Sequence, residues 1–379
     1  MSAITATAQR GELIDRLAAE PSSLTFDAPT VWLQTARGKP SDVLSVKEDA
    51  PIPKPGPNEV VVKVHSVSLN PVGYKLMGML FWPLCKLPMI PEGDFSGWVV
   101  DPNGHDSKWR INDEVIGLIE VPVRVNKGKG AMAQYITVDA ARIVPKPSNV
   151  PFDQAAGLPT VGMTANEGLF KHGNLQAGQR ILINGGSSSV GAIAIQLAKD
   201  KGATVVTSCS GPKMGMVKDF GADEVLDYTT SPLAEQLAKL PPVDLVFDAI
   251  GTQSLYDASP SFLKPEGQYV TISLDVHGVS TLRTAKLTAS LVSNFVRPTF
   301  LGGTARKFKM FSMQWDEDGM KKMTKLMEQG KLRVPIDERY ASDKQGVLAA
   351  YEKIMTNKVC NLWDSTFAKP RKADLIYDP

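Results

Sequence analysis

Residues 180–199 read RILINGGSSSVGAIAIQLAK, and this stretch decides which fold the rest of the chain is expected to adopt. An apolar run ends in a glycine- and serine-rich turn, and the turn opens a segment whose apolar residues suit one face of a helix. The pattern predicts a strand, a tight turn and a helix in succession. Backbone N–H groups and the dipole at such a helix N-terminus favour a negatively charged group such as a pyrophosphate.

Each residue type in the turn suits an anion-binding role. Gly185 and Gly186 permit close approach of the backbone, and Gly191 lets the helix pack tightly on the strand. The serines can add hydroxyl donors. The predicted pyrophosphate contacts are Gly186, Ser187, Ser188, Ser189, Val190 and Gly191. Glycine–serine turns also serve as plain connections between a strand and a helix, so the surrounding sequence has to discriminate between the two interpretations.

The next predicted strand, at 204–207, supplies that context because it ends about twenty residues after the turn, where a dinucleotide site places its ribose selector. Residues 208–213 read SCSGPK and contain no Asp or Glu. An acid would bind the ribose 2′-hydroxyl and repel a 2′-phosphate, whereas hydroxyls and Lys213 accept the phosphate. This favours NADPH over NADH. The alternative interpretation of Lys213 is a solvated residue in the first turn of a helix.

The predicted elements define an α/β protein with two different halves. From about Phe152 onward short apolar strands alternate with helices, which indicates βαβ units and a parallel sheet. The strands are predicted at 180–183, 204–207, 244–247 and 269–272, and the helices at 190–201 and 213–220. The preceding half shows only strands, at 60–69, 97–100, 114–119 and 133–138, and is expected to be an all-β unit. A helix at 316–329 with Gly330 as its cap should precede one more strand, one more helix and a tail.

Composition points to small-molecule chemistry. The 379 residues carry a formal net charge of +2, so neither a nucleic acid nor an anionic membrane is an expected partner. Cys85, Cys209 and Cys360 are far apart and should be free thiols in a reducing compartment. Residues 1–30 resemble neither a signal peptide nor a presequence, and apolar stretches are broken before the roughly 20 residues of a membrane span. We therefore expect a cytoplasmic protein.

Short motifs follow one another in a set order along the chain. They are NPVGYK at 70–75, GDFSG at 93–97, AMAQY at 131–135, QAAGLP at 154–159, the turn at 185–191, FGADEVLDY at 220–228 and FDAIG at 247–251. In these motifs the chain resembles the zinc-independent medium-chain dehydrogenase/reductases, especially quinone oxidoreductase-like proteins and the trans-acting enoyl reductases of fungal polyketide pathways. The resemblance covers nearly the whole chain after the first thirty or so residues. The motifs are specific for the superfamily and leave the substrate open.

The resemblance implies a domain organisation and further cofactor contacts. A GroES-like catalytic domain at 1–152, completed by 316–379, would accompany a Rossmann NADP-binding domain at 153–315. By analogy with the family, Thr164 would lie near the nicotinamide, and Ile250, Ser273 and Leu274 along the cofactor. Ser210, Lys213 and Tyr228 would lie near the 2′-phosphate. The alternative interpretation of Tyr228 is a half-buried aromatic residue at the end of a strand.

The sequence argues against a zinc site. A structural site needs four clustered cysteines and a catalytic site needs Cys or His with a further His and a carboxylate, but the cysteines and histidines here are scattered. His65 alternates with valines in a predicted strand and is interpreted as a packed or surface residue. Where zinc-dependent relatives carry Gly-His-Glu, this chain reads Glu92-Gly93-Asp94. We therefore predict no metal.

Hydride transfer to an activated double bond without a metal requires positioning, stabilisation of a developing oxyanion and a proton donor. The candidate catalytic residues are Lys75, Tyr74 and Asn70. A lysine matches Lys75 in the fungal enoyl reductases, and Asn70 is able to donate a hydrogen bond to a carbonyl or to the cofactor ribose. Tyr74 is equally interpreted as a core aromatic. The expected substrate is a small, apolar unsaturated carbonyl (enone or enoyl group) or a quinone.

Several departures from the family pattern affect this prediction. Gly73 replaces the usual acid of the Asn-Pro motif. Residues 79–82 read MLFW where the mitochondrial enoyl reductases carry a tyrosine proton donor, which disfavours that type. Phe81, Trp82, Met89, Phe295 and Phe300 are candidates for an apolar substrate cleft, although most such residues in proteins belong to the core.

Two functional hypotheses from different classes remain. The first is an NADPH-dependent reductase, acting alone or beside a biosynthetic synthase. The second is a non-catalytic NADPH-binding or structural protein with the same fold. A homodimer is expected only because dimers are common in the family.

Overall fold

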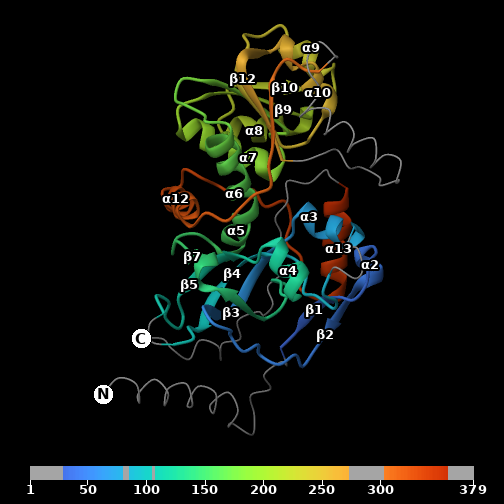
Figure 1. The fold of residues 1–379 in the computed structure, drawn as a ribbon, viewed down its shortest axis with the longest axis vertical. Coiled ribbons are helices and arrows are strands. Elements are labelled where there is room, and N and C mark those ends of the chain that lie inside the picture. The colour runs from blue at the N-terminus through green and yellow to red at the C-terminus, as the bar shows by residue number, and fades with distance from the viewer. Residues whose placement is uncertain (1–28, 80–84, 105–106, 273–302, 357–379) are drawn as a thin grey trace. The chain divides into compact units, whose positions relative to one another are not determined.

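A computed structural model describes residues 29–79, 85–104, 107–272 and 303–356 of the chain (Figure 1). These residues form two compact units. Unit 1 comprises 29–157 and 338–356, and unit 2 comprises 158–272 and 303–337. Ser273 and Leu274, two predicted cofactor contacts, lie outside the described residues. In the described part of the chain, no helix is long and apolar enough to span a bilayer.

Unit 1 is built on a five-stranded antiparallel sheet in the order β6-β3-β4-β5-β7, with a separate two-stranded sheet, β1-β2. The strands are β1 (Val31–Gln34), β2 (Leu44–Lys47), β3 (Glu59–Ser68), β4 (Asp94–Asp101), β5 (Glu114–Leu118), β6 (Tyr135–Asp139) and β7 (Ile143–Pro145). Alternate residues of β3 enter the core, among them Val60, Val62 and Val64. The four strands predicted in this half are confirmed.

The expectation that the first half is all-β was wrong, because several helices accompany its sheet. They are α2 (Pro40–Val43), α3 (Pro71–Met79), α4 (Val121–Lys127), the short 3₁₀ turn η1 (Ala140–Arg142) and α5 (Phe152–Ala156), joined in unit 1 by α13 (Lys344–Met355). α3 and α4 are too short for a sustained helical period, yet each has a proline in its first turn, where the missing N–H costs nothing.

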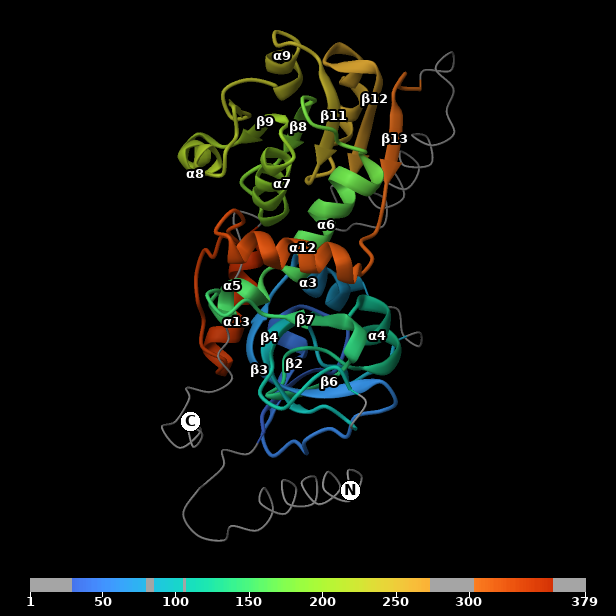
Figure 2. The same cartoon turned by 90° about the vertical axis from the view of Figure 1, so that its left-hand side faces the viewer.

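Unit 2 contains a six-stranded, fully parallel sheet in the order β10-β9-β8-β11-β12-β13 (Figure 2). The strands are β8 (Arg180–Asn184), β9 (Thr204–Cys209), β10 (Glu224–Asp227), β11 (Val243–Asp248), β12 (Leu263–Thr271) and β13 (Lys307–Met310). The chain winds outward from β8 to β10 and then returns to add β11 beside β8. This is the doubly wound Rossmann order, whose switch point lies between β8 and β11.

The helices of unit 2 largely follow the predicted pattern. They are α6 (Pro159–Asn166), the π-helical turn η2 (Glu167–His172), α7 (Ser189–Asp200), the 3₁₀ turn η3 (Gly211–Lys213), α8 (Met214–Asp219), α9 (Leu233–Leu237), α10 (Gln253–Asp257), the 3₁₀ turn η4 (Ser259–Ser261) and α12 (Glu317–Glu328). α12 ends as expected at Gly330, with φ of +69°. Its cap is a Schellman motif, since Gly330 N–H bonds to Met327 O and Lys331 N–H to Leu326 O, both at 2.9 Å.

Two differences from the predicted organisation concern the segment after residue 316. α12 lies in unit 2, because its buried face packs on α6; a Cβ on Gly162 would stand 3.1 Å from Met323 Sδ. The prediction of a strand after α12 was wrong, because residues 331–343 are all described and form no strand. There the Gln196 amide bonds to both the N–H and the C=O of Arg333, each at 2.8 Å, and takes the place of a neighbouring strand.

Phe247 offers a test of the unit 2 core. Its ring is fully buried in β11, and a Cβ on Gly168 would stand 2.2 Å from it, so η2 packs directly on the ring. We expect Phe247→Ala to lower the free energy of unfolding of this unit by about 3–5 kcal/mol. Hydrogen exchange should show lost protection of amides in β8 and β11, with those of β3 and β4 unchanged. The exposed Lys218→Ala is the control, and equal protection in both variants would contradict the packing described.

Candidate nucleotide and active site

The predicted nucleotide turn joins β8 to α7 in unit 2. Gly185 has φ of +83°, a conformation that favours glycine. Ser188 is the N-cap of α7: its Oγ accepts from Gly191 N–H at 3.1 Å and donates to Gly185 O at 2.7 Å. The turn therefore holds the N-terminus of α7 directly after the end of β8, at the switch point of the sheet.

The glycines of the turn are required by close contacts. A Cβ on Gly191 would stand 2.2 Å from Gly185 O, and one on Gly186 would stand 1.9 Å from Thr207 Oγ1. A Cβ on Gly185 would stand 2.5 Å from Ile250 Cδ1, so Ile250 covers the turn from the end of β11. The structure thus brings together the predicted contacts at 186–191 and Ile250, which is 40% exposed.

A buried carboxylate beneath the turn, Asp248, was missed as a functional residue. Its Oδ1 accepts from Asn184 Nδ2 at 2.8 Å, and its Oδ2 accepts from Tyr269 OH at 2.6 Å. Its two oxygens also accept the N–H groups of Ile250, Gly251 and Thr252 at 2.9–3.0 Å. In the sequence, Asp248 stands out only as a member of the FDAIG motif at 247–251. Nothing in its spacing indicated that one side chain joins three strand ends.

The link from Asp248 to the turn runs through two further polar side chains. Asn184 Oδ1 accepts from Ser208 Oγ at 2.6 Å, and that Oγ accepts from Gly185 N–H at 3.0 Å. Burial and the neighbouring Asp248 raise the pKa of Tyr269 well above its usual value, so its hydroxyl remains a donor. The ends of β8, β9, β11 and β12 are therefore held together by hydrogen bonds.

The predicted ribose selector lies at the ends of β9 and β10. Ser210 precedes η3, Lys213 ends it, and Tyr228 follows β10 with its N–H bonded to Cys209 O at 3.3 Å. Tyr228 is 55% exposed, a value that fits both interpretations of this residue. An acid that the local sequence did not reveal, Asp227, enters from β10: a Cβ on Gly211 would stand 2.8 Å from Asp227 Oδ2.

The carboxylate of Asp227 is engaged within this loop. Its Oδ1 accepts from Thr229 Oγ1 at 2.6 Å and from Thr229 N–H at 2.8 Å. These hydrogen bonds, together with one from Gly211 N–H, hold the pKa of Asp227 below its usual value. Asp227 therefore shapes the loop that carries Ser210 and Lys213.

Thr164 lies in α6 and lines a hollow of about 390 Å³ in unit 2. Its Oγ1 donates to Thr160 O at 2.6 Å. The other lining residues follow the ends of β12 and β13 and are mainly apolar: Ile272, Met310, Phe311, Ser312 and Met313. The hollow therefore suits a flat or apolar group near the carboxyl ends of the parallel strands.

The wall of this hollow is supported by the π-helical turn η2, a rare conformation that is frequent at functional sites. Glu167 is buried, bonds to Lys171 at 2.7 Å and accepts from Gln314 N–H at 2.9 Å. His172 contacts the Phe311 ring with a centroid distance of 4.4 Å. Burial lowers the pKa of His172.

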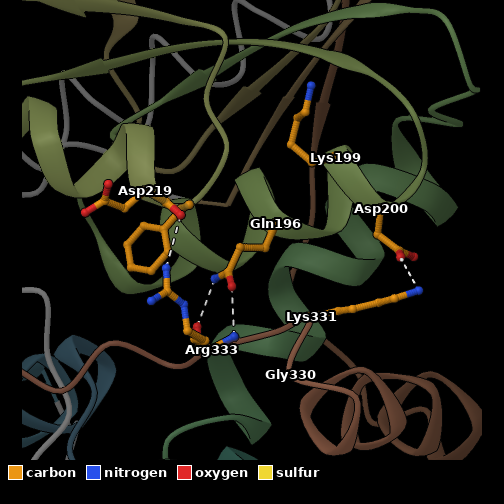
Figure 3. Close-up of a pocket in the computed structure, with 8 residues that line it drawn as sticks. Gln196, Lys199, Asp200, Asp219, Gly330, Lys331 and Arg333 are labelled. Atoms are coloured by element: carbon orange, nitrogen blue, oxygen red, sulfur yellow. Dashed lines mark hydrogen bonds and ion pairs between the residues drawn. The ribbon is translucent and has the colours of Figure 1, made fainter.

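A second hollow in unit 2, of about 530 Å³, lies beside the C-terminal half of α7 (Figure 3). Arg333 donates to Asp219 O at 3.1 Å, and its guanidinium lies 5.5 Å from the centre of the Phe220 ring. Lys331 faces Asp200 at 4.0 Å. The side chains around this hollow mainly bind one another.

The three candidate catalytic residues lie in unit 1, where β3 leads into α3. Asn70 is buried, and its Nδ2 donates to Asp94 Oδ2 at 2.9 Å. Tyr74 packs partly buried against the core of unit 1, as the interpretation of a core aromatic expects. Lys75, on the same turn of α3, is half-buried. The structure thus brings the three residues to one corner of the unit.

Glu92 lies next to these residues and was missed as a site residue. It is fully buried, accepts from Tyr351 OH at 2.7 Å and lies 3.4 Å from Asn70 N. Burial raises the pKa of Glu92 to about 7, against the positive charge of Arg124 and the Tyr351 hydrogen bond. A single acid in a loop carries no sequence signal for such burial.

The histidine and cysteine predictions can be compared with the structure. His65 stacks on Phe152 with a centroid distance of 4.5 Å and is a packed residue, as expected. Cys85 and Cys209 are free thiols, and Cys360 lies outside the described residues. Within the described ranges, no group of three or more His, Cys, Asp or Glu side chains has the arrangement of a metal site.

A Rossmann sheet with this turn and a separate antiparallel β unit in one chain are the architecture of dehydrogenase-type proteins. Residues 56–148 match the family described as the alcohol dehydrogenase GroES-like domain, and residues 220–360 match that described as zinc-binding dehydrogenase. The chain belongs to the medium-chain dehydrogenase/reductase family of oxidoreductases.

Relatives along most of the chain agree with this membership. A zinc-type alcohol dehydrogenase-like protein of Schizosaccharomyces pombe is 32% identical over 88% of this chain and 95% of its own length. A trans-enoyl reductase of Aspergillus terreus is 30% identical over 83% of this chain and 89% of its own. The solved quinone oxidoreductase of Coxiella burnetii superposes with a TM-score of 0.74 at 26% identity, covering 90% of this chain and 99% of its own.

The buried Glu92 generates a pH prediction for stability. Its pKa of about 7 in the folded protein lies above the ordinary 4.5, so folding favours the neutral carboxyl. Its stabilising contribution is complete below pH 4.5 and is lost as the pH rises through 7. Urea unfolding of unit 1 should show wild type losing roughly 3 kcal/mol relative to Glu92→Gln across this range. A pH-independent difference between the two proteins would contradict the burial of an ionisable carboxyl.

Proposed function

We propose that this oxidoreductase binds NADPH on the 185–191 turn and transfers hydride, without zinc, to an activated C=C bond of a small apolar carbonyl compound or to a quinone. The observation that carries the proposal is the turn at the β8/β11 switch point, where close contacts leave no room for a Cβ at Gly185, Gly186 or Gly191 and Ser188 caps α7. The relatives named trans-enoyl reductase and quinone oxidoreductase support the substrate classes.

The residues present suit a dinucleotide. The glycine positions leave no room for side chains, and the N-terminus of α7 favours the negative charge of a pyrophosphate. Thr164 and the apolar hollow beside it suit the nicotinamide and a flat apolar substrate. The proposed contacts are those named from the sequence: Thr164, residues 186–191, Ser210, Lys213, Tyr228 and Ile250, with Ser273 and Leu274 beyond the described residues.

The preference for the phosphorylated cofactor rests on the η3 loop. Lys213 supplies a positive charge, and Ser210 and the exposed Tyr228 supply hydroxyls for a 2′-phosphate. Asp227 would repel that phosphate if its carboxylate faced it freely. Its oxygens accept from Thr229 and Gly211, and these hydrogen bonds keep the carboxylate ionised. Asp227 therefore opposes a 2′-phosphate, and the proposed preference for NADPH rests on Lys213, Ser210 and Tyr228.

The chemistry proposed for the unit 1 residues follows from their side-chain types. NADPH supplies the hydride. Lys75 and Tyr74 are the proposed proton donor and oxyanion-stabilising groups, and the buried Asn70 amide, held by Asp94, orients the start of α3 and offers a hydrogen bond. The described residues that line the hollow beside Thr164 include no charged side chain, so the substrate is expected to be apolar.

Cofactor preference is tested by fluorescence titration. We expect NADPH to bind at least about tenfold more tightly than NADH, and Lys213→Ala to weaken NADPH alone by about tenfold, because one charge-assisted hydrogen bond is lost. Lys218→Ala, exposed on the adjacent α8, is the matched control. Equal binding of both cofactors, or an equal loss for both in Lys213→Ala, would exclude the 2′-phosphate site.

Catalysis is tested with a panel of quinones, enones and enoyl thioesters. We expect turnover of one class, and Lys75→Met should lower kcat by at least about a hundredfold through loss of proton transfer. The NADPH Kd should stay the same, and the exposed Lys47→Met should behave as wild type. Activity that survives exhaustive chelation supports the zinc-independent mechanism, whereas its loss and return with zinc would overturn it. Tight NADPH binding with no turnover would favour a non-catalytic role.

A further inference from the structure

A cluster of buried polar groups lies under α3, and the proposed chemistry leaves most of it unused. Glu92 and Asp94 are both fully buried, and each holds a different part of Asn70. Asp94 binds the side-chain amide at 2.9 Å, and Glu92 lies 3.4 Å from the backbone nitrogen. Asn70 is thus held by two carboxyl groups directly before the helix that carries Tyr74 and Lys75.

The carboxyl group of Glu92 occupies space that Gly73 leaves empty. A Cβ on Gly73 would stand 1.8 Å from Glu92 Oε1 and 2.5 Å from its Cδ. Any side chain at position 73 would therefore displace Glu92. Position 92 has φ of +57°, a backbone conformation in which glycine is the favoured residue.

These contacts bring together Gly73 and Glu92, two positions at which this chain differs from the pattern of its relatives. An acid is usual at position 73, where this chain has Gly73. Glycine begins the corresponding motif of zinc-dependent relatives at position 92, where this chain has Glu92. In the folded chain the Glu92 carboxyl group occupies the space beside Gly73. An acid therefore lies beside the first turn of α3, although position 73 itself is a glycine.

We propose that Glu92 is the positioning residue of the candidate catalytic helix. Entering from the loop before β4, its carboxylate takes the place of an acid at position 73 and holds Asn70 and the first turn of α3. This inference rests on the proposed function for its effect on turnover. Its structural part is independent of that function.

The ionised form of Glu92 suits this role better than the neutral form. A carboxylate accepts at both oxygens, so it binds the Tyr351 hydroxyl and the Asn70 N–H together, and its charge is favourable near the N-terminus of the nine-residue α3. A protonated carboxyl has one oxygen that must donate. At 3.4 Å the bond to Asn70 N–H is long, and ionisation should strengthen it.

The groups that act on the ionisation of Glu92 come from several elements of unit 1. Arg124 of α4 is buried and its positive charge favours ionisation of Glu92, as does the hydroxyl of Tyr351 from α13. Asp94 at the start of β4 opposes it. In the described part of the chain, the buried Arg124 Nε has no hydrogen-bond partner.

Exchanging the acid between the two positions tests the proposal. Gly73→Asp should clash with Glu92, and Glu92→Gly should remove the carboxylate; each is expected to lower kcat by at least about tenfold through misplacement of α3. The double variant Gly73→Asp, Glu92→Gly restores the acid and relieves the backbone at position 92. It should recover kcat to within about threefold of wild type. Losses that multiply in the double variant would overturn the proposal.

The isosteric Glu92→Gln variant guards against a trivial loss of folding. It keeps the shape and removes the charge, so kcat should fall by about tenfold while the NADPH Kd, a property of unit 2, stays the same. In wild type kcat should rise as the pH passes 7, and in Glu92→Gln it should not. Folding stability falls over the same pH range. A kcat that falls together with stability would show that Glu92 has only a structural role and would contradict the proposal.

A measurement without turnover separates this inference from the proposed function. In ¹⁵N-labelled protein, the backbone amide of Asn70 should titrate near pH 7 in wild type and lose this titration in Glu92→Gln. This result together with no turnover of any substrate would refute the reductase proposal and keep Glu92 as the group that holds α3. An Asn70 amide that is the same in both proteins at all pH values would refute the role of Glu92 whatever the activity.

Discussion

The nucleotide turn depends on one buried carboxylate, that of Asp248. Its two oxygens gather the Asn184 amide, the Tyr269 hydroxyl and three backbone N–H groups after β11. Each donor would be costly to bury without a partner, so loss of the carboxylate would leave several buried donors unpaired. Through Asn184 and Ser208 the same network reaches Gly185 N–H and sets where the turn starts.

Unit 1 places its candidate catalytic residues by a different means. Asn70, Glu92 and Asp94 form a buried polar cluster beside the apolar core, and ionisation of the Glu92 carboxyl group opposes folding. Stability and positioning therefore make opposite demands on Glu92. Such a conflict is expected at a functional site, where residues that reduce stability are retained because they position other groups.

Much of the fold was predictable because it rests on short-range patterns. The strand, turn and helix at 180–199 and the alternation after them predicted the parallel sheet, and Gly330 predicted the end of α12. The errors also have local causes. α3 and α4 span too few turns to show a helical period, and the Gln196 amide pairs with the backbone of Arg333 where a further strand was expected.

By itself, the sequence determined the family and the Rossmann turn, because close packing of a turn between a strand and a helix demands particular residue types at fixed spacing. Tertiary structure alone decided the roles of Asp227, Asp248 and Glu92. Each is a single acid with at least one partner far away in the chain, and only folding brings Asp227 to Gly211, Asp248 to Asn184 and Glu92 to Gly73 and Tyr351. A lone carboxylate has no period or spacing, so its function depends on the neighbours that packing provides.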